Sequence, residues 1–125
     1  MPKTPPEPKR ITSITELWEP IQGRVEAVLE AMKRRGFDAV IFESRRRLER
    51  QRWLYGVGRT HHKQRRPVTW TLDSRHIPGK AVDIISKSRL RSWPEFYDAL
   101  AEEGRNQGLD PLPAGLERCH LQWEG

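Results

Sequence analysis

The sequence predicts a single mixed α+β domain in which helices flank a short antiparallel sheet. Its 125 residues suffice for one hydrophobic core and not for two. Stretches with apolar residues at helical spacing alternate with short apolar runs of strand length. Because no internal repeat or linker divides the chain, we expect one folded domain over residues 11–125.

Residues 1–10 have a composition of their own. They contain four prolines and four charged side chains, which cannot bury enough apolar surface to offset the entropy of ordering. We therefore expect a flexible lead. This stretch also lacks the apolar region of a signal peptide, and no apolar run in the chain is long enough to span a bilayer.

The first half of the domain predicts helix, strand and helix. Apolar residues recur at helical spacing over residues 17–32, with Pro20 placed in the first turn and Gly36 at a C-terminal cap. Residues 38–43 form a short apolar run, which is typical of a buried strand. A second helix is expected over residues 47–55.

The middle of the chain predicts two further strands. A basic loop over residues 61–67 precedes a β-branched and aromatic run at 68–71, which we expect to be a strand. A loop over residues 72–80 then leads to the apolar run 81–85, a second expected strand.

The last third predicts a helix and a closing strand. Ser92 and Glu95 have the spacing of a capping box at the start of a helix. That helix is expected to fade over residues 104–108. A loop rich in Pro and Gly at 111–115 then precedes a strand near 117–123.

The charge balance predicts an anionic partner. Lys and Arg number 23 against 17 Asp and Glu, giving a formal charge of +6, which suits nucleic acid, acidic lipid or an anionic wall polymer. The arginine-rich stretch 45–52 and the basic loop leave open a nucleic-acid-binding surface. His61 and His62 lie in that loop, where we expect them to be solvated and not metal ligands.

Asp83 is the most informative residue because it stands inside the apolar run 81–85. A buried carboxylate requires a cation, either an arginine or a metal ion. His76 lies seven residues before it, and Glu117 lies three residues before His120. Two His and one Asp form a catalytic zinc set that leaves a fourth position for water.

Cys119 is the only cysteine, so no intramolecular disulfide can form, and synthesis in a reducing compartment fits. A thiol nucleophile beside His120 is the alternative. Adjacent residues on a strand point to opposite faces, so we interpret Cys119 as a buried structural residue.

The stretch from residue 74 to residue 83 resembles the S-x-H-x-x-G-x-A-x-D motif of the zinc D-alanyl-D-alanine carboxypeptidase and L-alanyl-D-glutamate endopeptidase family. This VanX/VanY-like family includes many phage endolysins. Every fixed position is present: Ser74, His76, Gly79, Ala81 and Asp83. The resemblance extends over roughly residues 17–123.

Two further segments are similar to the family's motifs. Glu117 and His120 match its Asp-or-Glu, two residues, His motif, and Arg46 aligns with its arginine in a Glu-x-x-Arg-Ser-x-x-x-Gln stretch. The resemblance implies Zn²⁺ bound by His76, Asp83 and His120, with Glu117 as the catalytic base. It places Arg46 at the oxyanion or the substrate carboxylate, although Arg45 and Arg47 depart from the family's usual residues.

The resemblance implies a zinc metallopeptidase that hydrolyses the stem peptide of bacterial peptidoglycan. An L-alanyl-D-glutamate endopeptidase of the endolysin type is expected, and a carboxypeptidase that removes terminal D-amino acids is the alternative. We expect a monomer without a membrane anchor that is made in a bacterial host's cytoplasm without a signal peptide. It would reach the wall through a phage or prophage holin or on lysis, and its basic surface would bind anionic wall polymers.

Overall fold

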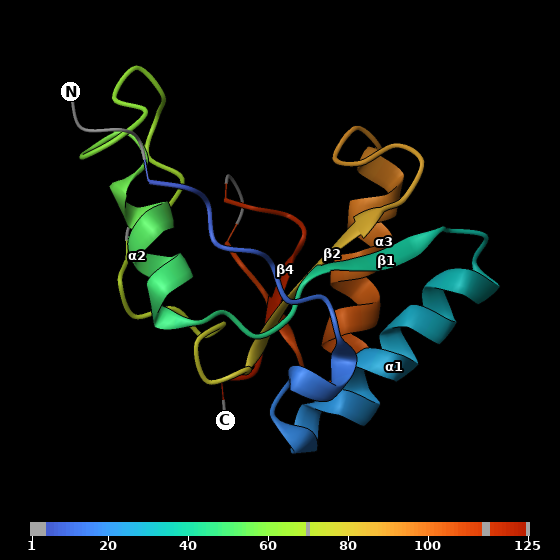
Figure 1. Ribbon diagram of the computed structural model, residues 1–125. Helices are drawn as coiled ribbons and strands as arrows, with labels where there is room; N and C mark the ends of the chain where they lie inside the picture. The colour runs from blue at the N-terminus through green and yellow to red at the C-terminus, as the bar shows by residue number, and fades with distance from the viewer. Residues whose placement is uncertain (1–4, 70, 114–115, 125) are drawn as a thin grey trace.

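The structure, a computed structural model, describes residues 5–69, 71–113 and 116–124 and confirms the expected α+β class (Figure 1). Three α-helices and four strands follow a short 3₁₀ helix in the described residues. In chain order the elements are η1 (Ile14–Glu16), α1 (Glu19–Arg34), β1 (Ala39–Glu43), α2 (Leu48–Gly56), β2 (Ala81–Ser86), α3 (Pro94–Asn106), β3 (Asp110–Pro111) and β4 (His120–Gln122).

The strands form one antiparallel sheet in the order β1-β2-β4-β3. β2 lies between β1 and β4, and all six of its residues are buried. Its Asp83 pairs with Glu43 on one side and with His120 on the other. The register thus brings three ionisable residues from three strands to the same level of the sheet.

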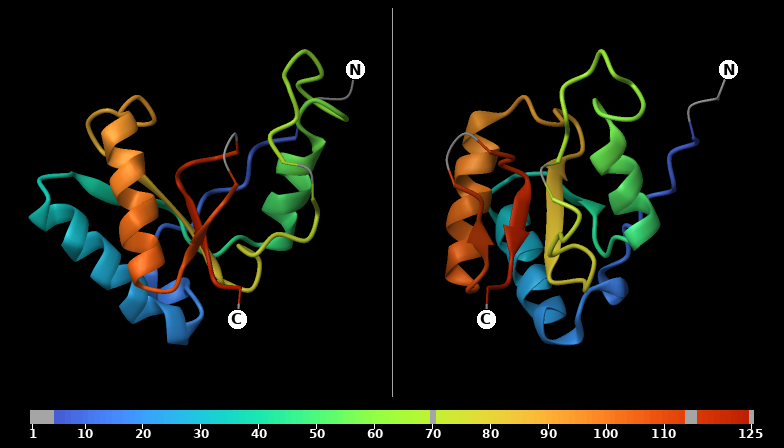
Figure 2. Two further views of the ribbon diagram at one scale, coloured as in Figure 1. Left: turned by 180° about the vertical axis from the view of Figure 1, so that it is seen from behind. Right: turned by 90° about the vertical axis from the view of Figure 1, so that its left-hand side faces the viewer.

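One face of the sheet carries the hydrophobic core. α1 and α3 cover this face, while α2 lies on the other side of the sheet (Figure 2). α1 buries Ile21, Val25, Val28 and Met32 at helical spacing. These side chains join one apolar cluster with Phe96 and Leu100 of α3 and the inward residues of β2 and β4.

The predicted helices are confirmed, and so are the strands expected at residues 38–43 and 81–85. Most of their ends are shifted by one or two residues. Pro20 lies in the first turn of α1. Gly36 has a φ of +87°, and the next amide bonds back to the carbonyl of Met32, as in a Schellman cap. The predictions for residues 38–43, 47–55 and 81–85 correspond to β1, α2 and β2.

Two local predictions were wrong. Residues 68, 69 and 71 form no strand, and residue 70 lies outside the described part; side chains of Arg59 and Gln51 instead bind the carbonyls of Thr69 and Thr71. The predicted capping box is absent because α3 begins one residue later, with Trp93 as its N-cap and no side-chain cap.

The C-terminal part also differs from its prediction. The closing strand is restricted to His120–Gln122 and pairs with β3, which the sequence did not predict. Residues 114 and 115 of the predicted loop lie outside the described residues. The helix before it ends at Asn106, within the range of residues 104–108 over which it was expected to fade.

The N-terminal segment runs along α2 and the end of β1. The carbonyl of Pro5 accepts a hydrogen bond from the Trp53 indole, and that of Pro8 accepts one from Arg50. Ser44 donates its backbone amide to the carbonyl of Ile11 at 2.7 Å. No helix among the described residues is long and apolar enough to cross a membrane.

Candidate metal centre

The structure brings His76, Asp83 and His120 together on the face of the sheet that α1 and α3 leave uncovered. Nε2 of His76 and Nδ1 of His120 each lie 3.2 Å from the same oxygen, Oδ1 of Asp83. The two imidazole centroids are 5.0 Å apart. All three side chains are buried, so the predicted ligand set exists as one compact group.

The hydrogen bonds around this group indicate a cation site. Nδ1 of His76 lies 2.8 Å from the carbonyl of Ser44 and must donate to it. Nε2 of His120 lies 2.8 Å from Oε1 of Gln122 and donates there. In these neutral tautomers the other ring nitrogen of each imidazole presents a lone pair toward Oδ1 of Asp83, whereas a protonated His120 would donate to that oxygen from Nδ1. Three atoms that can each ligate a metal therefore converge, which fits a metal ion.

Two residues shape the loop that carries His76. The hydroxyl of Ser74 accepts a hydrogen bond from the His76 amide at 3.1 Å. Gly79 has a φ of +77°, and a Cβ at this position would lie 2.9 Å from the backbone nitrogen of Trp18. The loop therefore requires glycine there.

The electrostatics of the group favour an ionised Asp83. Burial alone would raise its pKa, but the neighbouring His76 and His120 hold that pKa well below its ordinary value. Burial also opposes the charged form of His120, yet the hydrogen bond and charge of Asp83 raise the pKa of that imidazole. Without a metal the site would thus compensate its carboxylate by binding protons.

Glu117 stands beside this group in the turn before β4. It is an exposed residue, but one of its carboxylate oxygens lies within 4.8 Å of an Asp83 oxygen and of the Cys119 sulfur. Burial of the carboxyl group, followed by the charge of Asp83, raises the pKa of Glu117. This arrangement suits a general base near the predicted metal position.

Cys119 is buried in the apolar cluster, with 2% of its surface exposed. Burial and the two nearby carboxylates raise the pKa of its thiol to about 12. A thiol that holds its proton so firmly is a poor nucleophile. These observations support its interpretation as a structural residue.

Arg46 is the member of its arginine run that reaches the candidate metal centre. One of its terminal nitrogens lies 2.7 Å from Glu43 and 3.8 Å from the second oxygen of Asp83, and the other donates to Gln51 at 2.8 Å. Arg45 pairs with the exposed Glu16, while Arg47 is exposed at the N-cap of α2. Arg46 therefore places positive charge beside the carboxylate of Asp83.

Sequence reasoning missed Glu43 as the centre of this support. Its two oxygens bind Arg46 and Arg50, and only 1% of its surface is exposed. The available signals were the match of Glu43 to the Glu of the Glu-x-x-Arg-Ser-x-x-x-Gln stretch and its position three residues before Arg46 and seven before Arg50. Gln122, which orients His120, carried no signal because exposed-looking glutamines are common near strand ends.

The basic regions offer less free positive charge to a nucleic acid than the sequence indicated. Arg45, Arg46 and Arg50 form ion pairs with acidic side chains, which reduces the charge that a nucleic acid would meet. The expectation that His61 is solvated was wrong: it is 8% exposed and packs against Trp53 at 4.6 Å between ring centroids. It lies apart from the cluster of His76, Asp83 and His120.

This chain shares its fold with solved peptidases. No family model matches this sequence. No curated protein matches it either. Similarity is found at the level of structure, which confirms the expected VanX/VanY-like fold.

Three of the similar structures are those of peptidases. A mutant of the D,D-pentapeptidase VanY from a VanB-type cassette, in complex with Zn(II), is 21% identical with a TM-score of 0.68 over 87% of this chain and 73% of its own. The L-Ala D-Glu endopeptidase ChiX of Serratia marcescens is 20% identical with a TM-score of 0.61 over 92% and 90%. The LD-carboxypeptidase LdcB is 18% identical with a TM-score of 0.69, and this chain spans 59% of its length.

Proposed function

We propose that this chain is a zinc metallopeptidase that cleaves the stem peptide of bacterial peptidoglycan. The observation that carries the proposal is the convergence of three buried potential ligand atoms, from His76, Asp83 and His120, within 4.8 Å of one another. Zinc bound by these residues would supply a Lewis acid that lowers the pKa of water to about 7 and polarises a carbonyl. The shared fold with a Zn(II)-bound VanY supports this choice of metal.

Glu117 is the proposed general base. Its carboxylate oxygen, within 4.8 Å of Asp83, would take a proton as the oxygen of water bonds to the peptide carbonyl carbon. As the C–N bond breaks, Glu117 would return this proton to the leaving nitrogen, so that the products are a carboxylate and an amine. Arg46 would place positive charge near the developing oxyanion, although the contacts of its terminal nitrogens favour a positioning role on Asp83.

The proposed bond is the one between L-alanine and D-glutamate in the stem. Support comes from the ChiX endopeptidase, whose chain matches this one over 90% of its own length. Removal of a terminal D-amino acid is the alternative, which the similarity to VanY and LdcB favours. Both reactions use the same metal ligands and base.

The proposed setting is the cell wall of a bacterium lysed by a phage or prophage. In this proposal a monomer reaches the wall through a holin or on lysis, and its net charge of +6 holds it to anionic wall polymers. Binding to purified sacculi should then weaken as salt is added, because screening shortens the reach of surface charge. Binding that is independent of salt would contradict this part of the proposal.

Digestion of purified peptidoglycan tests the reaction directly. We expect zinc-loaded protein to release fragments with new D-glutamate amino termini, identified by mass spectrometry, and to lose this activity on chelation. Glu117→Gln should bind zinc but cleave nothing, whereas Glu26→Gln, an exposed control on α1, should act like the wild type. Release of free D-alanine would establish the carboxypeptidase alternative. Absence of cleavage by folded, zinc-loaded protein would refute both reactions.

A further inference from the structure

Two arginines from distant parts of the chain meet on one aromatic ring beside the candidate metal centre. The guanidinium carbon of Arg10 lies 3.9 Å from the ring centroid of Phe42, and that of Arg91 lies 4.9 Å from it. Phe42 precedes Glu43 at the end of β1, Arg10 belongs to the N-terminal segment, and Arg91 lies between β2 and α3. Two like charges are therefore held close together.

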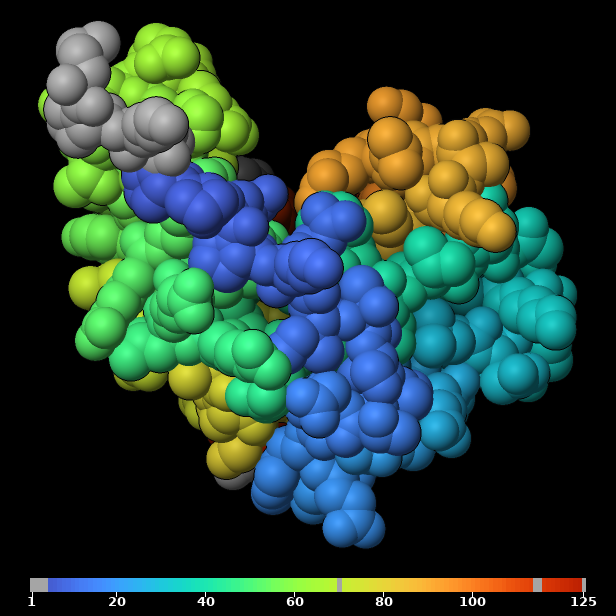
Figure 3. All heavy atoms as spheres, in the orientation of Figure 1, coloured from blue at the N-terminus to red at the C-terminus, as the bar shows by residue number. Residues whose placement is uncertain are grey.

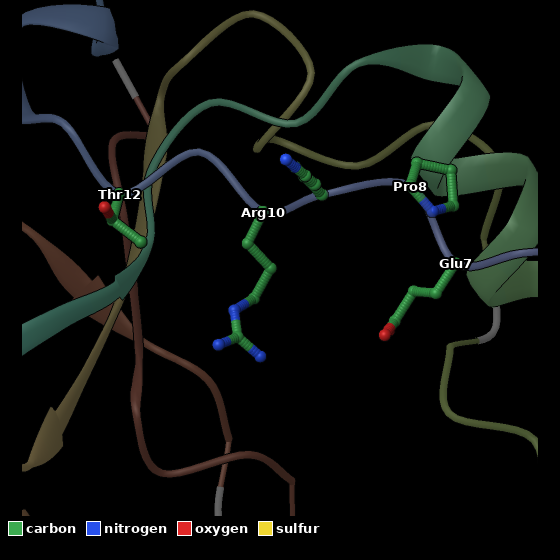
Figure 4. Close-up of a pocket in the computed structure, with 5 residues that line it drawn as sticks. Glu7, Pro8, Arg10 and Thr12 are labelled. Atoms are coloured by element: carbon green, nitrogen blue, oxygen red, sulfur yellow. The ribbon is translucent and has the colours of Figure 1, made fainter.

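Neither arginine has an acidic partner within 4.0 Å among the residues that the structure describes. The nearby Arg45, Arg46 and Arg50 all do. Glu7 and Arg10 project to the same side of the N-terminal segment (Figure 4), yet Glu7 pairs with Arg50 at 3.2 Å. Among the described residues, therefore, no carboxylate compensates the positive charges of Arg10 and Arg91 over the Phe42 ring.

Arg91 also lines a cavity next to the proposed base. The cavity measures about 270 Å³, and its lining consists of Arg91, Pro94, Tyr97, Glu117, Arg118 and Cys119. Arg118 pairs with Asp98, so of the two cations in this cavity Arg91 is the one without a carboxylate partner in the part of the chain that the structure describes. The Tyr97 hydroxyl donates to the carbonyl of Leu90, which holds the residue before Arg91 in place.

The molecule is hollowed on this side. Figure 3 shows a depression between α2 with its following loop and the segment that leads from β2 into α3, with the N-terminal segment along its near edge. Arg91 and Glu117 line the same cavity, so this cation lies beside the proposed base.

We infer that Arg91, supported by Arg10, binds the carboxylate of the amino acid whose nitrogen leaves in the reaction. This inference rests on the proposed peptidase function. In both candidate reactions the leaving residue is a D-amino acid whose free α-carboxylate is attached to the same carbon as the leaving nitrogen. Glu117 must deliver a proton to that nitrogen, so a cation beside Glu117 lies where this carboxylate would be. Arginine suits the task because its planar fork binds a carboxylate with two hydrogen bonds.

A matched pair of peptides tests the inference. One is N-acetyl-L-alanyl-γ-D-glutamyl-L-lysine, and the other carries a carboxamide in place of the D-glutamate α-carboxylate. We expect wild-type protein to prefer the acid, and Arg91→Gln to lower kcat/KM for the acid by about 10- to 100-fold, the value of a charged hydrogen bond, with little change for the amide. Arg91→Lys should recover part of the preference, and Arg10→Gln should reduce it less than Arg91→Gln does.

Arg89→Gln is the control, because Arg89 lies in the same turn but stacks on Trp93 at 4.3 Å outside the cavity lining. Arg91 is exposed, so its replacement should leave the thermal transition unchanged. An equal loss for both peptides in Arg91→Gln would show a structural role and overturn the inference. Equal rates for the two peptides with wild-type protein would overturn it as well.

Binding to Glu117→Gln separates this inference from the proposed reaction. Isothermal titration calorimetry with the same peptides needs no turnover. Tighter binding of the acid that disappears in the Glu117→Gln, Arg91→Gln double variant would uphold the carboxylate site, even if wild-type protein cleaved neither peptide and the proposed reaction failed. Equal binding of both peptides would refute the site and leave the reaction to be judged by digestion.

Discussion

Replacing Glu43 by Gln should destabilise the protein by disturbing the charges behind the candidate metal centre. Glu43 is 1% exposed and neutralises two buried guanidinium groups, those of Arg46 and Arg50. The amide keeps the shape of the side chain but presents N–H to one of these donors and removes the negative charge. Breaking a buried ion pair from one side costs about 3 to 5 kcal/mol.

Both arginines keep other partners when Glu43 is replaced, so the expected loss of unfolding free energy lies near the lower limit of this range. Arg46 keeps its bond to Gln51 and its approach to Asp83 at 3.8 Å, and Arg50 keeps Glu7 at 3.2 Å. We therefore expect the free energy of unfolding to fall by about 3 kcal/mol, which lowers the Tm by roughly 10 °C in a domain of this size.

Chemical denaturation of metal-free protein, followed by Trp fluorescence, measures this change. Glu49→Gln serves as the control, because Glu49 is exposed in the first turn of α2 and its replacement should cost less than about 1 kcal/mol. Zinc affinity should also weaken in Glu43→Gln, since Arg46 would be drawn toward Asp83. If Glu43→Gln unfolded within about 1 kcal/mol of wild type, the buried network would not stabilise the fold as argued.

Three other predictions concern the same site. Because the pKa of Glu117 is raised above 4.5 and only the carboxylate acts as a base, kcat/KM should fall as the pH drops through that raised pKa; a profile with an acidic limb at or below 4.5 would contradict this assignment. Cys119→Ser should retain kcat/KM near the wild-type value, since the thiol has a pKa of about 12; loss of peptide cleavage with zinc still bound would restore the nucleophile alternative. Gly79→Ala should lower stability by about 1 to 3 kcal/mol, because φ is +77° and the new Cβ would lie 2.9 Å from backbone. Thermal unfolding checks it, with Gly23→Ala, whose Cβ would have nothing within 4 Å, as a control that should not lose stability.

The sequence was sufficient to predict the parts of the site that local patterns encode. Asp83 within an apolar run required a cationic partner, and the strand that carries it is β2, as expected. The motif spacing brought His76 and His120 into the same prediction. Periodicity identified α1 because its buried residues repeat at helical intervals over 16 residues.

The parts of the fold and the site that the sequence did not predict depend on contacts between residues that are distant along the chain. β3 has two residues and exists because β4 pairs with it, so it has no local signature. Residues 68, 69 and 71 have β-forming chemistry but no neighbouring strand, and side chains of α2 and the following turn take their carbonyls. The contact between Arg10 and Arg91 over Phe42 joins three segments that no spacing rule relates.

Polar contacts, and not apolar burial, attach α2 to the rest of the molecule. α2 contributes no side chain to the apolar cluster; the side chains it buries, Arg50 and Gln51, are polar and bind Glu43, Pro8 and Thr71. Elements held by hydrogen bonds and ion pairs instead of apolar burial form units of low local stability. This helix and the N-terminal segment should therefore detach together as one cooperative unit, and amide hydrogen exchange would be faster there than in α1 and β2. One wall of the depression could then move while the sheet that carries Asp83 and His120 stays folded.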